Sequence, residues 1–294
     1  MLADWIKAIF FGMVEGLTEW LPVSSTGHLI LLSDRLPFAF SQDPVFAAEF
    51  REFFDVAIQV GAILAVPVVL RNRVPLPLRG RSAGEKATLR SLWAKIALAS
   101  LPAAVLGVLG DRLLLRLTGR DLDGWLYNGP VVAIALIVYG VAFLAAERSG
   151  MRRPPRVGTT EAISPRTALG VGWFQALSLI PGTSRSGSTI LGATLLGVSR
   201  SAATEFSFLM AIPVLLGAGA VKAVGFAGYL REDPAAMPAV GWAVLATGCA
   251  VSFAVSLAAV RFLTEFVRRH SFRAFGIYRI ALGTAVLVWW CMTK

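Results

Sequence analysis

Residues 12–28 read GMVEGLTEWLPVSSTGH, an apolar segment that Pro, Ser, Thr and Gly interrupt in its second half. Residues 172–187 read GWFQALSLIPGTSRSG and align with them, with a gap of one residue on each side of the shared proline. Neither half of such a broken segment is comfortably long enough to cross a bilayer. Non-helical backbone is tolerated at membrane depth only where protein or a polar cavity surrounds it. We therefore predict two re-entrant helical hairpins, at residues 3–34 and 167–198.

The composition predicts an all-α integral membrane protein. Of the 294 residues, 56% are hydrophobic and only 16% are charged, whereas soluble domains contain about 45–50% apolar and about 25% charged residues. Six other apolar runs are long enough to cross the hydrocarbon core, which is roughly 30 Å thick. We predict these full crossings at about residues 52–70, 92–115, 127–147, 203–222, 239–260 and 273–292.

The net charge of +10 predicts an orientation rather than nucleic-acid binding, because the cations gather in the connections between apolar runs. Three connections that fall on one face are rich in arginine and lysine, and the opposite loops carry charges of mixed sign. Cytoplasmic loops carry such an excess of cations, so we expect this face in the cytoplasm and both termini outside. The cations are Arg71, Arg73, Arg79, Arg81, Lys86, Arg90, Arg148, Arg152, Arg153, Arg156, Arg166, Arg261, Arg268, Arg269 and Arg273.

The two hairpins predict an internal repeat within a single membrane domain, residues 1–294. Each hairpin is followed by three crossings, and because three is odd, the second half must be inserted upside down. The first inverted repeat would cover residues 1–150 and the second residues 160–294. Such repeats place polar sites near the midplane, where broken helices meet. Chance similarity between Gly-, Pro- and Ser-rich stretches is the alternative.

The first hairpin carries two acids, Glu15 and Glu19, which are four residues apart and share one helix face. Two carboxylates this close in an apolar setting suit a divalent metal, a general acid or base, or both. The alternative is a pair that snorkels to the outer surface. The second hairpin has Gln175 and Leu179 at the matching positions, so only one of the two hairpins is acidic.

Three consecutive hydroxyl residues follow the acids, namely Ser24, Ser25 and Thr26. If a half-helix begins here, its free N–H groups and positive dipole end would favour phosphate. His28 stands three residues after Ser25 and near both carboxylates, which favours a functional histidine over a structural one. His270, in a basic loop, is interpreted as solvated surface.

The second hairpin carries a cation at membrane depth, Arg185, which costs on the order of 3 kcal/mol to insert and needs an anionic partner. A planar guanidinium binds phosphate through two parallel hydrogen bonds. The hydroxyl groups beside it add donors, and they belong to Ser184, Ser186, Ser188 and Thr189. The alternative is a structural pair between Arg185 and one of the glutamates.

Four further polar residues lie in predicted crossings, and structural roles are as good an interpretation as functional ones. They are Asp55, Gln59, Glu205 and Arg279.

At residues 15–28 and 181–189 the chain resembles the undecaprenyl-diphosphatases, also called bacitracin-resistance proteins, and residues 54–66 and 197–208 support the resemblance. It implies hydrolysis of undecaprenyl pyrophosphate, a lipid, to undecaprenyl phosphate, which recycles the carrier for peptidoglycan synthesis in the bacterial cell membrane. It also implies an inverted repeat and a divalent cation, with Mg²⁺ and Ca²⁺ as candidates. By position, the functional residues would be Glu15, Glu19, Ser24, Ser25, Thr26, His28, Ser184, Arg185 and Thr189.

Our mechanistic hypothesis places the lipid tail against apolar helices and the pyrophosphate in a polar cavity that opens to the outer face. Glu15 and Glu19 would hold the metal. Ser25 is our first choice of nucleophile, with His28 or Glu19 relaying its proton, and attack by water or by His28 itself stays open. Broken helices in inverted repeats are also common in transporters, so a polyprenyl-phosphate flippase is the alternative function. A second copy of the chain is a candidate partner.

Overall fold

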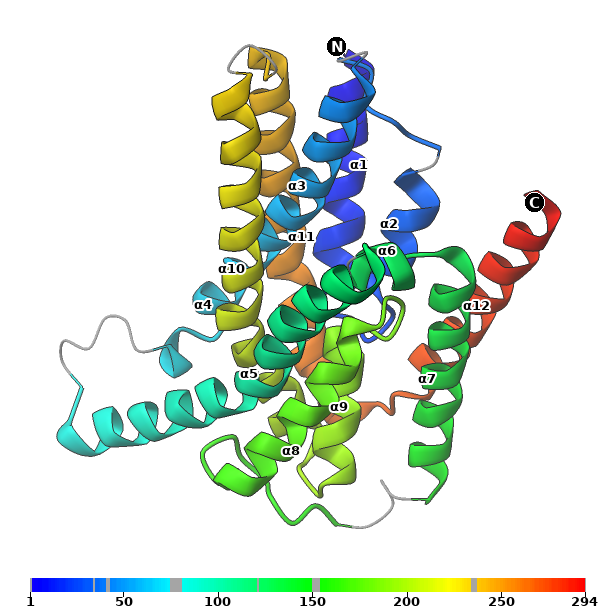
Figure 1. The fold of residues 1–294 in the computed structure, drawn as a ribbon. Coiled ribbons are helices and arrows are strands. Elements are labelled where there is room, and N and C mark those ends of the chain that lie inside the picture. Colours follow the sequence, from blue (N-terminus) through cyan, green and yellow to red (C-terminus); the bar gives the residue numbers. More distant parts are fainter. Residues whose placement is uncertain are drawn as a thin grey trace.

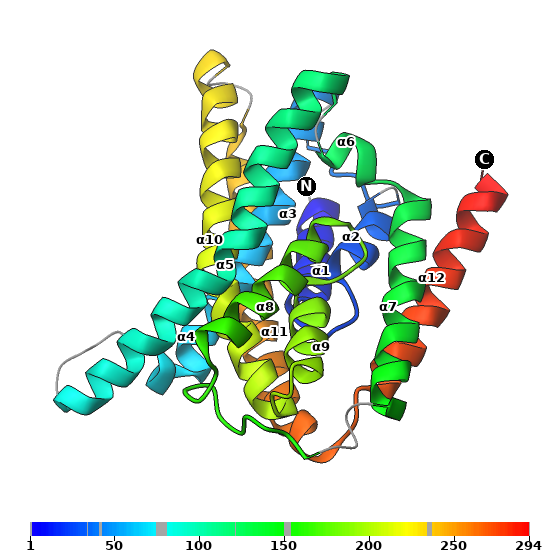
Figure 2. The ribbon, with the colours of Figure 1, turned by 60° about the horizontal axis from the view of Figure 1, so that its bottom comes forward.

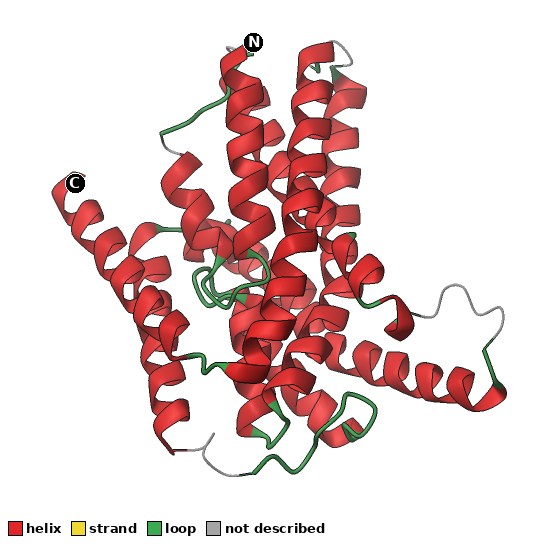
Figure 3. Cartoon of the chain, turned by 180° about the vertical axis from the view of Figure 1, so that it is seen from behind, coloured by secondary structure: helices red, strands yellow, loops and turns green. Residues whose placement is uncertain are grey.

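The chain forms a bundle of helices, and the described residues contain no β-strand (Figures 1 and 3). The computed structural model describes residues 2–33, 35–40, 43–74, 81–120, 122–149, 154–233 and 237–293. Its α-helices are α1 (Leu2–Thr18), α2 (Ser25–Ser33), α3 (Pro44–Ile63), α4 (Ala65–Val69), α5 (Ala83–Thr118), α6 (Leu122–Leu126), α7 (Gly129–Ser149), α8 (Pro165–Ala176), α9 (Arg185–Leu195), α10 (Arg200–Glu232), α11 (Ala239–Arg269) and α12 (Arg273–Thr293). Two short 3₁₀ turns, η1 (Arg71–Arg73) and η2 (Leu177–Leu179), complete the described elements.

All six predicted crossings are confirmed as helical segments long and apolar enough to span a membrane. Four of them are longer than predicted, because the helix continues beyond the apolar stretch at one or both ends. The spans are Pro44–Val69, Ala83–Thr118, Gly129–Arg148, Arg200–Glu232, Ala239–Arg269 and Arg273–Met292. The first crossing is interrupted between α3 and α4, where Pro67 lacks the N–H that would bond the carbonyl of Ile63.

The two segments that the sequence marked as broken are helix–turn–helix pairs in the middle of the bundle. The pair α1 and α2 extends toward the end of the molecule that holds the N-terminus, and the pair α8 and α9 extends toward the opposite end (Figure 1). Figure 2 shows both pairs between the group α3, α5, α10 and α11 and the pair α7 and α12. Loop segments gather at mid-height inside the bundle (Figure 3).

Glycines allow the hairpin helices to pack closely against long helices of the other half of the chain. α1 lies along α11, and α8 lies along α5. A Cβ on Gly12 would stand 2.6 Å from the carbonyl oxygen of Gly248, and one on Gly172 would overlap the carbonyl oxygen of Ala99. Small residues let backbones approach closely where lipid tails give no hydrophobic drive to association. The positions Gly12 and Gly172 are also matched in the aligned broken segments.

The remaining long helices also pair across the two halves. α7 packs along α12, where Gly140 and Gly276 face each other, and α3 packs against α10 and α11. The start of α5, the described residues 154–164 before α8 and the connection before α12 all lie toward the end opposite the N-terminus (Figure 1). Arg79, Arg152 and Arg153, three of the cations expected there, lie outside the described residues.

Candidate active site

Two turns of matching geometry connect the paired half-helices. Ser24, just before α2, has φ 73°, and Ser184, just before α9, has φ 69°; they are the only described non-glycine residues with positive φ. Each serine hydroxyl accepts a bond from the amide three residues on, which belongs to Gly27 in one turn and Gly187 in the other. Non-glycine residues held in this region of φ and ψ are uncommon and cluster at functional sites.

The two turns are in direct contact. The hydroxyl of Ser186, in the first turn of α9, donates to the carbonyl of Glu19 at 3.1 Å and lies 3.3 Å from that of Leu21. Gly182, with φ 91°, approaches α7 so closely that a Cβ would stand 2.5 Å from the carbonyl oxygen of Val132. The tips of the acidic hairpin and of the arginine hairpin therefore meet inside the bundle.

Arg279 of α12 holds both turns. Its guanidinium donates to the carbonyl of Pro22 at 3.1 Å, and to those of Gly182 and Thr183 at 2.8 Å each. The residue is 0% exposed, and its guanidinium carbon lies 5.5 Å from the ring centroid of Tyr139. Carbonyl dipoles from both turns thus replace the hydration of this buried cation.

Ser25, Glu19 and Arg185 form a continuous polar chain at the contact between the hairpins. The hydroxyl of Ser25 donates to Oε2 of Glu19 at 2.8 Å, and a guanidinium nitrogen of Arg185 donates to Oε1 at 2.9 Å. The side chains of Glu19 and Arg185 are each 8% exposed. A serine hydroxyl bonded to a buried carboxylate has a proton acceptor already in place, which is the arrangement of an activated nucleophile.

Arg185 is anchored on its other side by α10. It donates to the carbonyl of Ser207 at 2.7 Å, and the hydroxyls of Thr189 and Ser207 share a bond of 2.6 Å. The Nε–H of Arg185 has no acceptor among the described residues. The guanidinium therefore keeps one buried donor that a ligand oxygen can use.

Glu15 lies one helical turn before Glu19 and is 0% exposed. Neither of its carboxylate oxygens accepts a hydrogen bond from a donor in the described part of the chain. The negative charges of Glu19 and Asp55 disfavour a negative charge on Glu15, whereas the positive charge of Arg185 favours it. A buried carboxylate without donors is costly, so this group fits a site that binds a cation or a proton.

Within the described residues, no hydrogen bond joins the His28 side chain to Ser25 or Glu19. One ring nitrogen, Nδ1, is bonded to the carbonyl of Ser24 at 2.7 Å, and the other, Nε2, to the hydroxyl of Tyr278 at 2.7 Å. The two rings stack with centroids 5.7 Å apart. Of the two proton relays expected for Ser25, only Glu19 is in hydrogen-bond contact with it.

The other predicted polar residues take separate places. Asp55 pairs with Arg51 at 3.0 Å in α3. Glu205 pairs with Arg73 at 2.6 Å, away from the turns and at the basic end of the bundle. Thr26 is half-buried at the start of α2, and no hydrogen bond joins its side chain to the polar chain of Ser25, Glu19 and Arg185 within the described residues.

From the sequence, Arg279 was identified as a polar residue within a crossing but was given no role. Ser207 and Tyr278 were not identified as functional candidates. Arg279 had a usable signal, because a cation inside an apolar crossing is a candidate functional residue. Ser207 and Tyr278 lie in apolar helices, and nothing in their spacing indicated that they face the two turns.

Comparisons with known proteins show which family the chain resembles. The sequence model of the family described as "Bacitracin resistance protein BacA" matches residues 8–285. The chain is similar to the undecaprenyl-diphosphatase of Acetivibrio thermocellus, with 44% identity over 294 residues and 100% of both chains. It is also similar to the undecaprenyl-diphosphatases of Enterococcus faecalis, with 44% identity over 96% of both chains, and of Streptococcus mutans, with 44% identity over 98% of this chain and 96% of that one.

Proposed function

The chain belongs to the bacitracin resistance protein BacA family and hydrolyses undecaprenyl pyrophosphate to undecaprenyl phosphate and inorganic phosphate, and we propose that this reaction takes place where its two turns meet. The single observation that carries the proposal is the buried chain from Ser25 through Glu19 to Arg185. It joins a nucleophile, a base and a phosphate-binding cation from the two hairpins.

The phosphates of the substrate are held by Arg185 and by the first turns of α2 and α9. Arg185 offers its free Nε–H, and the hydroxyls of its chain neighbours Ser184 and Ser186 share a bond of 3.1 Å. The first amides of a helix have no intrahelical partner, and its dipole is positive at that end. Because both helices begin at the contact between the turns, two such ends serve one diphosphate.

Ser25 is the nucleophile. Its Oγ attacks the terminal phosphorus while its proton passes to Glu19, and the bridging P–O bond breaks to release undecaprenyl phosphate. The proton on Glu19 leaves with undecaprenyl phosphate. Water then attacks the phosphorus of the phosphoserine and passes a proton to Glu19, which returns it to Oγ of Ser25 as the Oγ–P bond breaks and inorganic phosphate leaves. Phosphoryl transfer depends mainly on positioning and electrostatic stabilisation, and the contact of 2.8 Å between Ser25 and Glu19 provides the positioning.

A divalent cation fits beside these groups. Hard cations such as Mg²⁺ take oxygen ligands and usually complete their shell with water and substrate phosphates. The described residues contain no group of three or more His, Cys, Asp or Glu that could hold a metal by itself. Glu15, whose two oxygens are free of donors, would bind the cation together with Glu19. The cation would neutralise negative charge on the phosphates.

The two halves of the chain are inverted repeats with re-entrant hairpins, and the site opens to the outer face of the cell membrane. Two observations support the repeat: the matched serines with positive φ, and the matched packing of α1 on α11 and of α8 on α5. The basic connections at one end support a cytoplasmic location for that end, following the positive-inside rule.

Phosphate release from undecaprenyl pyrophosphate by the purified chain in detergent tests the function. We expect turnover in the intact chain and none in Ser25→Ala or Arg185→Ala, and acid quenching should trap a phosphoserine at residue 25. Movement of labelled polyprenyl phosphate across proteoliposomes without any phosphate release would instead indicate a flippase.

Labelling with a membrane-impermeant maleimide tests the orientation. The chain has two cysteines, Cys249 and Cys291, so a background with both replaced by alanine can carry one new cysteine at a time. In intact cells Glu232→Cys should be labelled, and Gly84→Cys should react only after lysis. The reverse pattern would refute the outward-facing site.

A further inference from the structure

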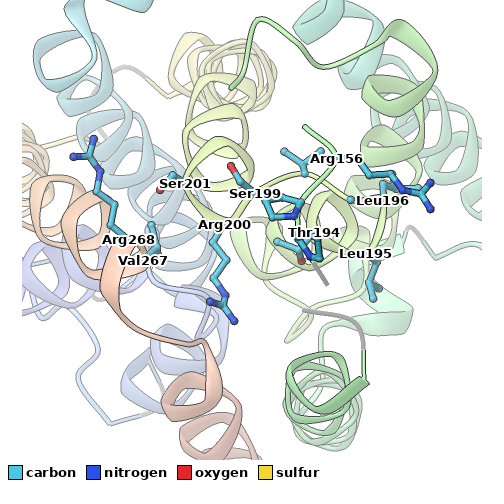
Figure 4. A pocket seen from close by; sticks show the side chains of 13 residues that line it. Arg156, Thr194, Leu195, Leu196, Ser199, Arg200, Ser201, Val267 and Arg268 are labelled. Carbon is cyan, nitrogen blue, oxygen red and sulfur yellow. The ribbon is translucent and has the colours of Figure 1, made fainter. Parts of the chain in front are cut away.

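A cavity lies at the basic end of the bundle, away from the two turns. It measures about 710 Å³ and is formed by residues 154–156, by the junction of α9 and α10, and by the end of α11. Figure 4 shows Arg268 and Arg156 on opposite sides of it, with Arg200, Ser199 and Thr194 between them. Nothing in the proposed hydrolysis uses this cavity.

The lining of the cavity is positively charged. Three arginines, Arg156, Arg200 and Arg268, belong to it, and no acidic side chain does among the described residues. Arg200 is paired with Glu147 at 2.7 Å. Arg268 lies 3.8 Å from Glu265 in an exposed pair, and such a pair contributes little. The arginines of the lining therefore carry more positive charge than the neighbouring acidic side chains neutralise.

Backbone donors add to this charge. Ser199 caps the N-terminus of α10 and accepts from the amide of Ala202. The amides of Arg200 and Ser201, which precede Ala202 in that first turn, have no partner within the helix. A helix of 33 residues thus directs its positive end into a cavity that already holds three guanidinium groups, a combination that favours a phosphate-bearing anion.

The rim of the cavity is apolar on one side. Leu195 and Leu196 line it and are 52% and 41% exposed. The cavity also lies at the basic end of the bundle, which the positive-inside rule places in the cytoplasm. Basic pockets between membrane helices on that side bind lipid headgroups, whereas a free anion gains nothing from exposed leucines.

We propose that this cavity binds the headgroup of an acidic phospholipid, with a phosphate at the first turn of α10 and with Arg156 and Arg268 balancing the charge of the headgroup from opposite sides of the cavity. The acyl chains lie against Leu195 and Leu196. The three guanidinium groups are spread around the cavity rather than gathered at one point (Figure 4), which suits a headgroup larger than a single phosphate.

Native mass spectrometry of the purified full chain in detergent tests this proposal. The probes are phosphatidylglycerol, cardiolipin and phosphatidylcholine, each titrated separately, and inorganic phosphate as a competitor. The variants are Arg156→Gln and Arg268→Gln. Their matched control is Arg269→Gln, which removes the same charge from the neighbouring exposed residue that does not line the cavity.

We expect the intact chain to bind the acidic lipids at least about tenfold more tightly than phosphatidylcholine. Arg156→Gln and Arg268→Gln should each weaken binding of the acidic lipids about fivefold, the usual contribution of one arginine near an acidic surface. Arg269→Gln should change the affinity for the acidic lipids by no more than about twofold. Phosphate release should stay normal in all three variants.

Two results would overturn the proposal. Equal losses of lipid affinity in Arg268→Gln and Arg269→Gln would show a general effect of surface charge rather than a specific binding site. Displacement of the lipid by millimolar inorganic phosphate would show that the cavity takes the free anion instead. If either arginine variant unfolds, Ser201→Asp replaces it: it adds a negative charge to the lining and should abolish the preference for acidic lipids.

Discussion

Arg185 and Glu19 form an ion pair of 2.9 Å although 166 residues separate them in the chain. Both side chains are only 8% exposed, so each charge depends on the other for solvation. Removal of one partner from a buried pair leaves an uncompensated charge. The pair therefore couples the geometry of one hairpin to that of the other.

Replacement of Glu19 or Arg185 by alanine should abolish turnover. Each substitution removes a group placed to stabilise charge or accept a proton during phosphoryl transfer, and we expect phosphate release to fall at least about 100-fold. The measurement is release from undecaprenyl pyrophosphate in detergent, with monodispersity as the check on folding. Glu265→Gln, in an exposed ion pair, is the control, and near-normal turnover in either alanine variant would refute the assignment.

Removal of the Ser25 hydroxyl should reduce kcat more than it changes KM. If Ser25 is the nucleophile, Ser25→Ala should lower kcat at least about 1,000-fold, because the covalent route is lost. Ser33→Ala is the matched control at the other end of α2, where the hydroxyl donates to the carbonyl of Leu29. A Ser25→Ala enzyme that keeps a tenth or so of its kcat would assign the attack to water.

Glycine should be tolerated better than alanine at Ser24 and at Ser184. Both residues have positive φ, which glycine adopts freely and alanine does not. We expect Ser24→Ala to be less stable than Ser24→Gly by about 1 kcal/mol, with the same order at Ser184. Thermal unfolding in detergent measures the difference. Equal melting temperatures for the two variants would mean that the turn relaxes to negative φ.

Arg279 should be required for stability as well as for activity. It donates to three carbonyls from both turns, and Arg279→Lys keeps the charge but cannot reproduce that set of bonds. We expect a loss of about 3 kcal/mol or more in the free energy of unfolding, together with a fall in kcat. The exposed Arg273, also in α12, serves as control through Arg273→Lys. An Arg279→Lys variant with a normal melting temperature and normal turnover would show that Arg279 does not hold the two turns together.

Turnover should depend on a divalent cation that Glu15 helps to bind. A chelator should stop phosphate release, and added Mg²⁺ or Ca²⁺ should restore it. In Glu15→Gln the cation concentration for half-maximal rate should rise about tenfold, because one charged oxygen ligand is lost. Turnover that continues in excess chelator would remove the cation from the mechanism. An unchanged cation requirement in Glu15→Gln would remove Glu15 from its site.

Most of the architecture followed from local sequence, because hydrophobicity and helix breaking act over short distances. The six crossings were found from runs of apolar residues, and the two broken segments from Pro, Gly, Ser and Thr within such runs. Glu19 and Arg185 stood out for the same reason, since a charge at membrane depth must have a partner. The ends of the helices were placed less well, because charged flanks such as those at the start of α5 and the end of α11 look like loops until packing extends the helix.

What only the tertiary structure decided is which polar groups meet. Arg279 lies 257 residues from Pro22, whose carbonyl it binds, and no spacing in the chain encodes that contact. The positive φ of Ser24 and Ser184, the support of Arg185 by Ser207, and the pairing of His28 with Tyr278 likewise arise from packing between the two halves. The amino-acid sequence determined which segments enter the membrane and which charges they carry, because transfer into lipid depends on each segment alone. The active arrangement depends on hydrogen bonds between segments, which exist only once the helices have packed.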